Sequence, residues 1–185
     1  MPDRTPQDAN LQQQNRPITN YELTRVRNES RAALIAGDSE SERSRFYEHL
    51  TDAESVPTFS DVAEADELAR FIGETDFESK SVLLLVRPIP ECYELRLTGV
   101  SKEGDGVDSQ YCRDMRPADV QCKKDAEDTV GVAIRLPLAG DSFNSLGMGF
   151  GSSCDDRPSM VHFEPVTPTS NATTTSTAET GGGSE

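Results

Sequence analysis

Apolar positions in the middle of the chain follow the two patterns that are typical of β-strands. Residues 81–86 (SVLLLV) are continuously apolar but too short for an ordinary helix, which predicts a strand covered on both faces and ended by 87–90 (RPIP). Residues 92–100 and 128–138 alternate between two kinds of side chain, which predicts strands that place one set of apolar side chains on a single face. The side chains expected on those faces are Tyr93, Leu95 and Leu97, and Val130, Val132, Ile134, Leu136 and Leu138.

Residues 60–73 carry apolar side chains at helical spacing and give the clearest helix prediction. Ser60 or Asp61 is placed to cap the N-terminus, and Gly73 stands where a helix often ends in a left-handed residue. The apolar face of this helix comprises Val62, Ala65, Leu68, Ala69 and Ile72. We therefore expect this helix to pack on a sheet.

Weaker signals precede this helix. Residues 21–27 have strand character, and residues 31–36, after a turn at NES, are expected to form a partner strand. Residues 37–50 are ambiguous, because Ser39 is placed to cap a short helix.

The second half of the chain contains turn signals. Residues 102–108 (KEGDGVD) predict a hairpin turn in which Asp105 and Gly106 supply positive φ angles, followed by a strand at 106–112. Residues 140–158 are expected to form a Gly-rich loop with room for a short strand.

These elements predict an α+β fold, a small and mainly antiparallel β-sandwich or half-barrel with one packed helix. Residues 1–20 are polar and Gln-rich, and we expect them to be disordered. Residues 21–164 then form a single domain. Residues 165–185 form a Thr-, Ser- and Gly-rich tail, which we also expect to be disordered and which is similar to the stalks of surface proteins.

The net charge of the chain limits the classes of macromolecule that we expect it to bind. The chain has 33 acidic and 18 basic residues and a net charge of −15, and only 4 of the bases are lysines. An acidic surface so poor in lysine is typical of extremely halophilic archaea, because molar salt screens the repulsion between carboxylates. Nucleic acid and anionic membranes carry the same sign of charge, so we expect neither as a partner. No apolar run is long enough to span a membrane.

The main question about the chemistry of this chain is what its four cysteines do. They lack the close C-x₂₋₄-C pairs of structural zinc sites and the C-x-x-C of redox motifs, although Lys123 and Lys124 beside one of them weakly favour a reactive thiol. An even count with long spacings fits two disulfides better. Three pairings are open, and our first choice is Cys92–Cys122 with Cys112–Cys154.

No catalytic or cofactor site is predicted. The sequence GMGFG at 147–151 lacks the helix start that a phosphate-binding loop needs. His49 and His162 are the only histidines, and no G-x-S-x-G elbow accompanies them. The acidic clusters do not match a calcium-binding loop. We therefore expect no catalytic residue, no metal ligand and no cofactor.

The centre of the chain carries a resemblance. The segment from ARFIGETDFESKSVLLLV through CYELRLTGV to AIRLPL, with Thr75-Asp76-Phe77 and Tyr93, resembles secreted or lipid-anchored haloarchaeal proteins of unknown function. More remotely it is similar to the C-terminal domain of PrcB-like, protease-stabilising proteins. Those domains have Gly-Gly before the Tyr where this chain has Glu91-Cys92, and the lipobox cysteine of many haloarchaeal relatives is missing here. The resemblance implies a small β-sandwich-like fold with no known activity.

Three functional hypotheses follow. The first is a non-enzymatic, exported surface module that binds a protein partner or has a structural role, with its oligomeric state open. The second, implied by the resemblance, is a protease inhibitor or stabiliser. The third is a cytoplasmic thiol or metal-binding protein. Disulfides favour export, and the two N-x-S/T triplets, at Asn28 and Asn171, are then glycosylation candidates. Residues 1–20 lack the apolar region of a signal peptide, so export leads us to expect a leader upstream of them.

Overall fold

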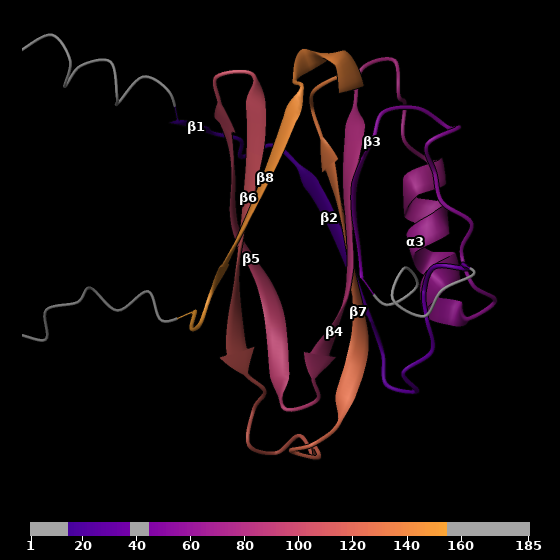
Figure 1. The fold of residues 1–185 in the computed structure, drawn as a ribbon, viewed down its shortest axis with the longest axis vertical. Coiled ribbons are helices and arrows are strands. Elements are labelled where there is room, and N and C mark those ends of the chain that lie inside the picture. Colours follow the sequence, from indigo (N-terminus) through magenta and orange to yellow (C-terminus); the bar gives the residue numbers. More distant parts are fainter. Residues whose placement is uncertain (1–14, 38–44, 155–185) are drawn as a thin grey trace, which may run out of the picture. The chain divides into compact units, whose positions relative to one another are not determined.

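Two four-stranded β-sheets pack face to face, and one α-helix covers the outer face of one of them (Figure 1). The computed structural model describes residues 15–37 and 45–154. The first sheet has the order β1-β5-β6-β8 and the second has the order β2-β7-β4-β3. The elements are β1 (Asn15–Pro17), β2 (Glu22–Asn28), β3 (Phe46–Leu50), α3 (Ala63–Gly73), β4 (Ser81–Pro90), β5 (Tyr93–Glu103), β6 (Gly106–Met115), β7 (Glu127–Leu136), the 3₁₀ turn η1 (Gly140–Ser142) and β8 (Ser145–Gly151).

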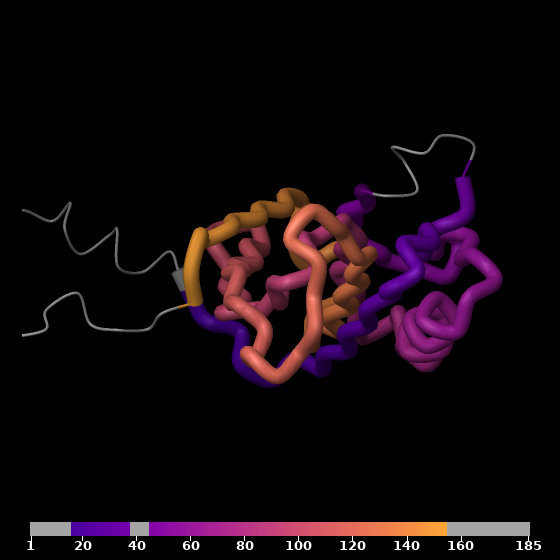
Figure 2. Tube along the Cα trace, turned by 90° about the horizontal axis from the view of Figure 1, so that it is seen from below, coloured from indigo at the N-terminus to yellow at the C-terminus, as the bar shows by residue number. Residues whose placement is uncertain are grey.

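The predicted fold class is confirmed. Each neighbouring pair of strands is antiparallel except β6 and β8, which run parallel. The two sheets do not close into a barrel, so the sandwich is the correct form of the prediction (Figure 2). The ordered part begins before Tyr21, because Asn15–Pro17 pairs with Ser101–Glu103 of β5. None of the helices in the described ranges has the length and apolar character needed to cross a membrane.

The main core lies between the two sheets. It combines alternate residues of β5 and β6 with the inner face of β4 and β7. Its members include Leu83, Leu85, Leu95, Val100, Val107, Tyr111, Val130, Val132, Ile134 and Leu136. The alternation predicted for residues 92–100 and 128–138 therefore points the expected side chains inward.

A second core lies between the other sheet face and α3. Residues 81–86 are all buried, because their odd and even side chains enter different cores, as the continuous apolar run predicted. Ala65, Leu68 and Ile72 of the helix are fully buried. Gly131 permits this packing, since a Cβ there would lie 2.6 Å from Leu68 Cδ1 and 2.9 Å from Leu34 Cδ1.

The helix ends differ from the prediction. The helix begins at Ala63 with Val62 as its N-cap, and no side chain caps it, so neither Ser60 nor Asp61 has the expected role. The expected left-handed end at Gly73 is also wrong, because the chain continues through Glu74 at φ −82°.

Two predictions for the first third of the chain are wrong. Residues 31–36 form no strand; Ile35 makes only an isolated bridge with Phe59, and β2 pairs instead with β7, about a hundred residues away. The ambiguous segment 37–50 ends as strand β3 rather than as a helix, and Ser39 lies outside the described residues. Both predictions failed for the same reason: partners far away in the sequence decide which strands pair, and local patterns do not show them.

Two further corrections concern strand ends. The proline-containing segment 87–90 does not end β4. The β3 pairing reaches only as far as Val86, so no described strand needs the missing amide hydrogens of the prolines on that edge. The hairpin turn after β5 lies one residue earlier than predicted. Glu103 pairs with Gly106, and Gly104, at φ 54°, supplies the positive angle.

Candidate functional site

All four cysteines lie in two disulfides. Cys92, in the turn between β4 and β5, is bonded to Cys122 in the β6–β7 connection, with Cα atoms 5.1 Å apart. Cys112 on β6 is bonded to Cys154, just after β8, with Cα atoms 5.0 Å apart. This is the pairing that the sequence analysis placed first. No cysteine is free, so the chain in this state offers no thiolate for catalysis or for a metal.

The remaining sequence candidates do not assemble into a catalytic or metal site. The His49 ring stacks on Phe143 with centroids 4.1 Å apart, and burial lowers its pKa. Its Nε2 has no hydrogen-bond partner among the described residues. His162 lies outside them. Within residues 15–37 and 45–154, no three His, Cys, Asp or Glu side chains come together as a metal site.

The GMGFG segment is a strand, not a loop. It belongs to β8, whose Leu146 packs into the main core and whose Phe150 stacks on Tyr111 with ring centroids 5.4 Å apart. The intervening glycines face the other way, under polar side chains of β6. A Cβ on Gly147 would lie 2.4 Å from Asp108 Oδ1, and one on Gly149 would lie 2.1 Å from Gln110 Oε1. The glycines therefore serve close packing between strands.

A hollow opens where β3 and β4 of one sheet approach β8 of the other. We call this surface the β3–β8 flank; its cavity has a volume of about 240 Å³ and is lined by Arg45, Phe46, Tyr47, Leu85, Val86, Arg87, Met148 and Phe150. Phe150 is 41% exposed and Met148 is 36% exposed. Both sit on the inward-facing side of β8, at the place where the sandwich is open. The flank thus combines exposed apolar groups with two arginines.

Positive charge gathers on this flank. The Arg87 guanidinium lies 4.2 Å from the centroid of the Phe150 ring, a cation–π arrangement. Burial lowers the pKa of Arg87, and the nearby charges of Arg113 and Arg45 lower it further. None of these three arginines forms an ion pair with another residue of the described ranges. In a chain of net charge −15, three arginines without an ion-pair partner in the described ranges make this surface distinct.

The backbone of β8 completes the flank. Strand β8 pairs with β6 on one side only, so its other edge has no strand partner in the described part of the chain. Its sequence, SLGMGFG, contains no charge and no proline. Edge strands of natural proteins usually carry lysine, proline or a bulge that prevents another strand from adding. Strand β8 lacks these protections.

Tyr47 links the two sheets at this flank. Its hydroxyl donates to the Gly147 carbonyl oxygen at 3.1 Å and lies 2.9 Å from Ser109 Oγ. Burial raises the pKa of Tyr47, so the hydroxyl keeps its proton at neutral pH. The contact therefore links β3 of one sheet to both β6 and β8 of the other.

Sequence reasoning missed this flank. The alternation of Leu146, Met148 and Phe150 with glycines is itself a strand signal, but the high glycine content favoured a loop. No sequence signal brings Arg45, Arg87 and Arg113 together, since they lie on three different strands or loops of two sheets.

Asn28, one of the two glycosylation candidates, forms hydrogen bonds inside the fold. Asn28 is only 4% exposed; its Nδ2 donates to Glu64 Oε2 at 3.0 Å, and its Oδ1 accepts from the Ala32 amide at 3.1 Å. The side chain therefore ties the end of β2 to helix α3 and is closed to a glycan in the folded chain. Asn171 lies outside the described residues.

Comparison with known proteins returns no relative: no family model, no curated protein and no solved structure matches this chain.

Proposed function

We propose that this protein is a non-enzymatic binding module that captures an extended segment of another protein along the free edge of β8. The observation that carries the proposal is the unprotected edge of β8 beside an exposed aromatic side chain and three arginines without described carboxylate partners. A peptide that adds a strand gains main-chain hydrogen bonds from the edge, while pockets beside it select alternate side chains.

The chemistry of the flank specifies the partner segment. Phe150, Met148 and Tyr47 favour an aromatic or aliphatic side chain that is buried against them. Arg45, Arg87 and Arg113 favour carboxylates at neighbouring positions, because an acid relieves the mutual repulsion of the guanidiniums. We therefore infer an extended partner segment in which acidic residues flank an aromatic residue.

We place this module outside the cell. Two disulfides in a small domain support this location, because reducing compartments keep cysteines as thiols. The excess of acids over bases further supports a high-salt environment. The measurement is the unfolding temperature in salt from about 0.1 M to about 2 M KCl, where screening becomes strong. We expect it to rise steeply, and an unchanged value would contradict the halophilic part of the proposal.

The binding test is selection of random twelve-residue peptides displayed on phage against the full-length protein. We expect the enriched peptides to combine acidic residues with an aromatic residue. Their affinity for the Arg87→Gln variant should fall by about tenfold, the size of one charge-assisted contact. Enrichment of peptides without acids, or no enrichment over an unrelated protein, would refute the proposal.

The matched control is Arg96→Gln. Arg96 lies on β5 and is 56% exposed, with only distant ion pairs to Glu94 and Asp114 at 3.9 and 3.5 Å. This variant removes the same charge elsewhere on the domain and should bind the selected peptides as the unchanged protein does. Equal weakening in both variants would show a general charge effect and no site on the flank.

A further inference from the structure

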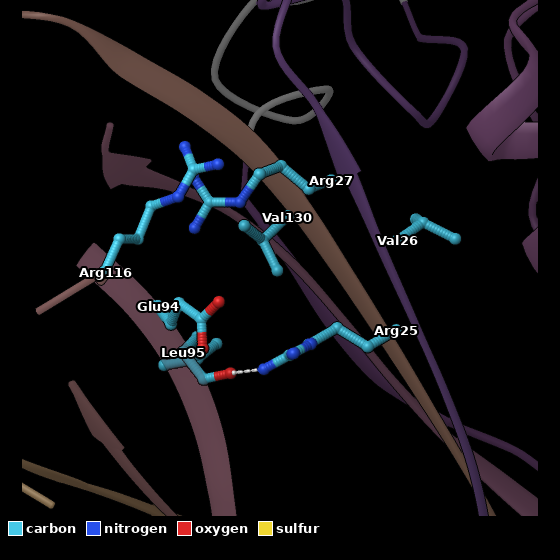
Figure 3. A pocket seen from close by; sticks show the side chains of 7 residues that line it. All are labelled: Arg25, Val26, Arg27, Glu94, Leu95, Arg116 and Val130. Atoms are coloured by element: carbon cyan, nitrogen blue, oxygen red, sulfur yellow. Dashed lines mark hydrogen bonds between the residues drawn. The ribbon is translucent and has the colours of Figure 1, made fainter. Parts of the chain in front are cut away.

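A second cavity lies at the opposite side of the sandwich, where β2 of one sheet faces β5 of the other (Figure 3). Its volume is about 240 Å³, and it is lined by Arg25, Val26, Arg27, Glu94, Leu95, Arg116 and Val130. We call it the arginine pocket. It shares no residue with the β3–β8 flank, so an inference from it is independent of the proposed peptide binding.

The strand pattern of β2 builds this pocket. Arg25 and Arg27 are two residues apart and pair with Val132 and Val130 of β7, so both project from the face that meets the other sheet. Because β2 is an edge strand, their long side chains extend past the core. Arg116, which follows β6, enters from the other sheet, and its side chain is only 15% exposed.

Structural bonds use only some of the donors in the pocket. Arg25 Nη1 donates to the Leu95 carbonyl oxygen at 2.7 Å, as Figure 3 shows. Arg27 donates to the Tyr93 carbonyl oxygen and, at 2.5 Å, to Asp128 Oδ2. Each guanidinium has more N–H groups than these bonds occupy. The pocket therefore offers several half-buried donors to a bound acceptor.

The most buried charges of the pocket are two guanidiniums and one carboxylate, which favours an anion beside them. Asp128, only 2% exposed, lies 2.5 Å from Arg27 and 4.0 Å from Arg116. Two guanidiniums thus share one buried carboxylate. The other two acids lie nearer to solvent: Glu29, 70% exposed, is 3.6 Å from Arg116, and Glu94, 30% exposed, is 3.9 Å from Arg96. A planar fork of donors suits oxyanions, to which it donates parallel hydrogen bonds.

Glu94 makes the pocket selective. It lines the pocket, and Figure 3 shows its carboxylate beside Leu95 and below the guanidiniums of Arg27 and Arg116. An ionised carboxylate only accepts hydrogen bonds. It therefore repels a fully deprotonated oxyanion such as sulfate, but it accepts a hydrogen bond from an oxyanion that keeps a proton. Inorganic phosphate keeps at least one proton at neutral pH.

We propose that the arginine pocket binds inorganic hydrogen phosphate, with Arg25, Arg27 and Arg116 donating to its oxygens and Glu94 accepting from its hydroxyl. The bound ion would bridge β2 to β5 and to the segment after β6, so it would also stabilise the packing of the two sheets.

The test is isothermal titration calorimetry of the full-length protein with sodium phosphate and, separately, with sodium sulfate at equal ionic strength. We expect phosphate to bind at least about tenfold more tightly than sulfate, the discrimination of one hydrogen bond against one unpaired charge. Glu94→Gln keeps the shape of the side chain and removes the repulsion, so in this variant sulfate should bind about as tightly as phosphate.

Arg116→Gln should weaken phosphate binding by about tenfold or more. Arg70→Gln, which removes one positive charge from helix α3 away from the pocket, is the matched control and should leave binding unchanged. Because Arg116 also contacts the Glu91 carbonyl oxygen at 3.3 Å, circular dichroism of the variant confirms its fold first. If that variant does not fold, the Glu94→Gln comparison decides the matter alone. Equal affinity of the unchanged protein for both ions, or no binding of either, overturns the proposal.

Discussion

Arg135 on β7 donates a hydrogen bond from Nη2 to the carbonyl oxygen of Phe71 at 2.5 Å, and its guanidinium lies 4.2 Å from the centroid of the Phe71 ring. The same side chain donates from Nε to Thr75 Oγ1 at 3.0 Å. A cation on the sheet therefore satisfies a carbonyl at the C-terminal end of helix α3, which is the end where positive charge is favourable. This contact replaces the left-handed glycine that the sequence predicted as the helix stop.

Replacement of this arginine should loosen the helix. In Arg135→Met the side chain keeps its volume but leaves Phe71 O and Thr75 without their donor, so we expect the free energy of unfolding to fall by about 1–3 kcal/mol. Urea denaturation followed by circular dichroism measures this. Lys80→Met removes an exposed ion pair with Glu22, which also pairs with Arg135, and should have a much smaller effect. Equal losses in both variants would contradict the role of the buried contact.

Replacement of glycine by alanine should have opposite effects on stability at Gly131 and at Gly73. Gly131→Ala places a Cβ 2.6 Å from Leu68 Cδ1, so we expect a loss of about 1–3 kcal/mol in the free energy of unfolding. Gly73→Ala meets nothing within 4 Å, and its backbone is not left-handed. Alanine is the better helix former, so this variant should be as stable as the unchanged protein or more stable. A loss of stability in the Gly73→Ala variant would instead support a left-handed backbone at Gly73.

The burial of His49 predicts that the stability of the fold depends on pH. Burial lowers the pKa of His49, so below the ordinary histidine value of about 6.5 the unfolded chain binds a proton that the folded chain does not. Stability is therefore present above that pH and falls as the pH drops from about 7 to about 5. In His49→Phe, which keeps the ring beside Phe143, the decline should be shallower. Thermal unfolding across this range tests it, and identical slopes would exclude His49 as the cause.

The disulfides should contribute strongly to stability. Replacing both members of the Cys112–Cys154 pair or of the Cys92–Cys122 pair by alanine should lower the free energy of unfolding by about 2–5 kcal/mol, within the range for native bridges in small domains. Non-reducing peptide mapping of the unchanged protein should recover these two pairs and no free thiol. A different pairing, or free thiols in protein from its native source, would remove the support for a location outside the cell.

The sequence alone determined the class of fold, because short-range patterns carry that information. The alternation in 92–100 and 128–138 and the apolar run at 81–86 specify which side chains must leave water, and the spacing of Leu68 and Ile72 specifies a helix. An even number of widely spaced cysteines likewise indicated disulfides. These signals depend on local periodicity and composition, which a reader of the sequence sees directly.

Only the tertiary structure decided which strands pair and which charges meet. Strand β2 pairs with β7 and not with the adjacent 31–36, because the strand that best covers its edge is distant in the chain. Arg25, Arg27 and Arg116 converge because two sheets bring β2 beside β5, and Arg45, Arg87 and Arg113 gather at the other opening of the same sandwich. Periodicity shows which face of a strand is buried, but it does not show which strand stands opposite. Both proposed binding sites therefore became visible only in the folded chain.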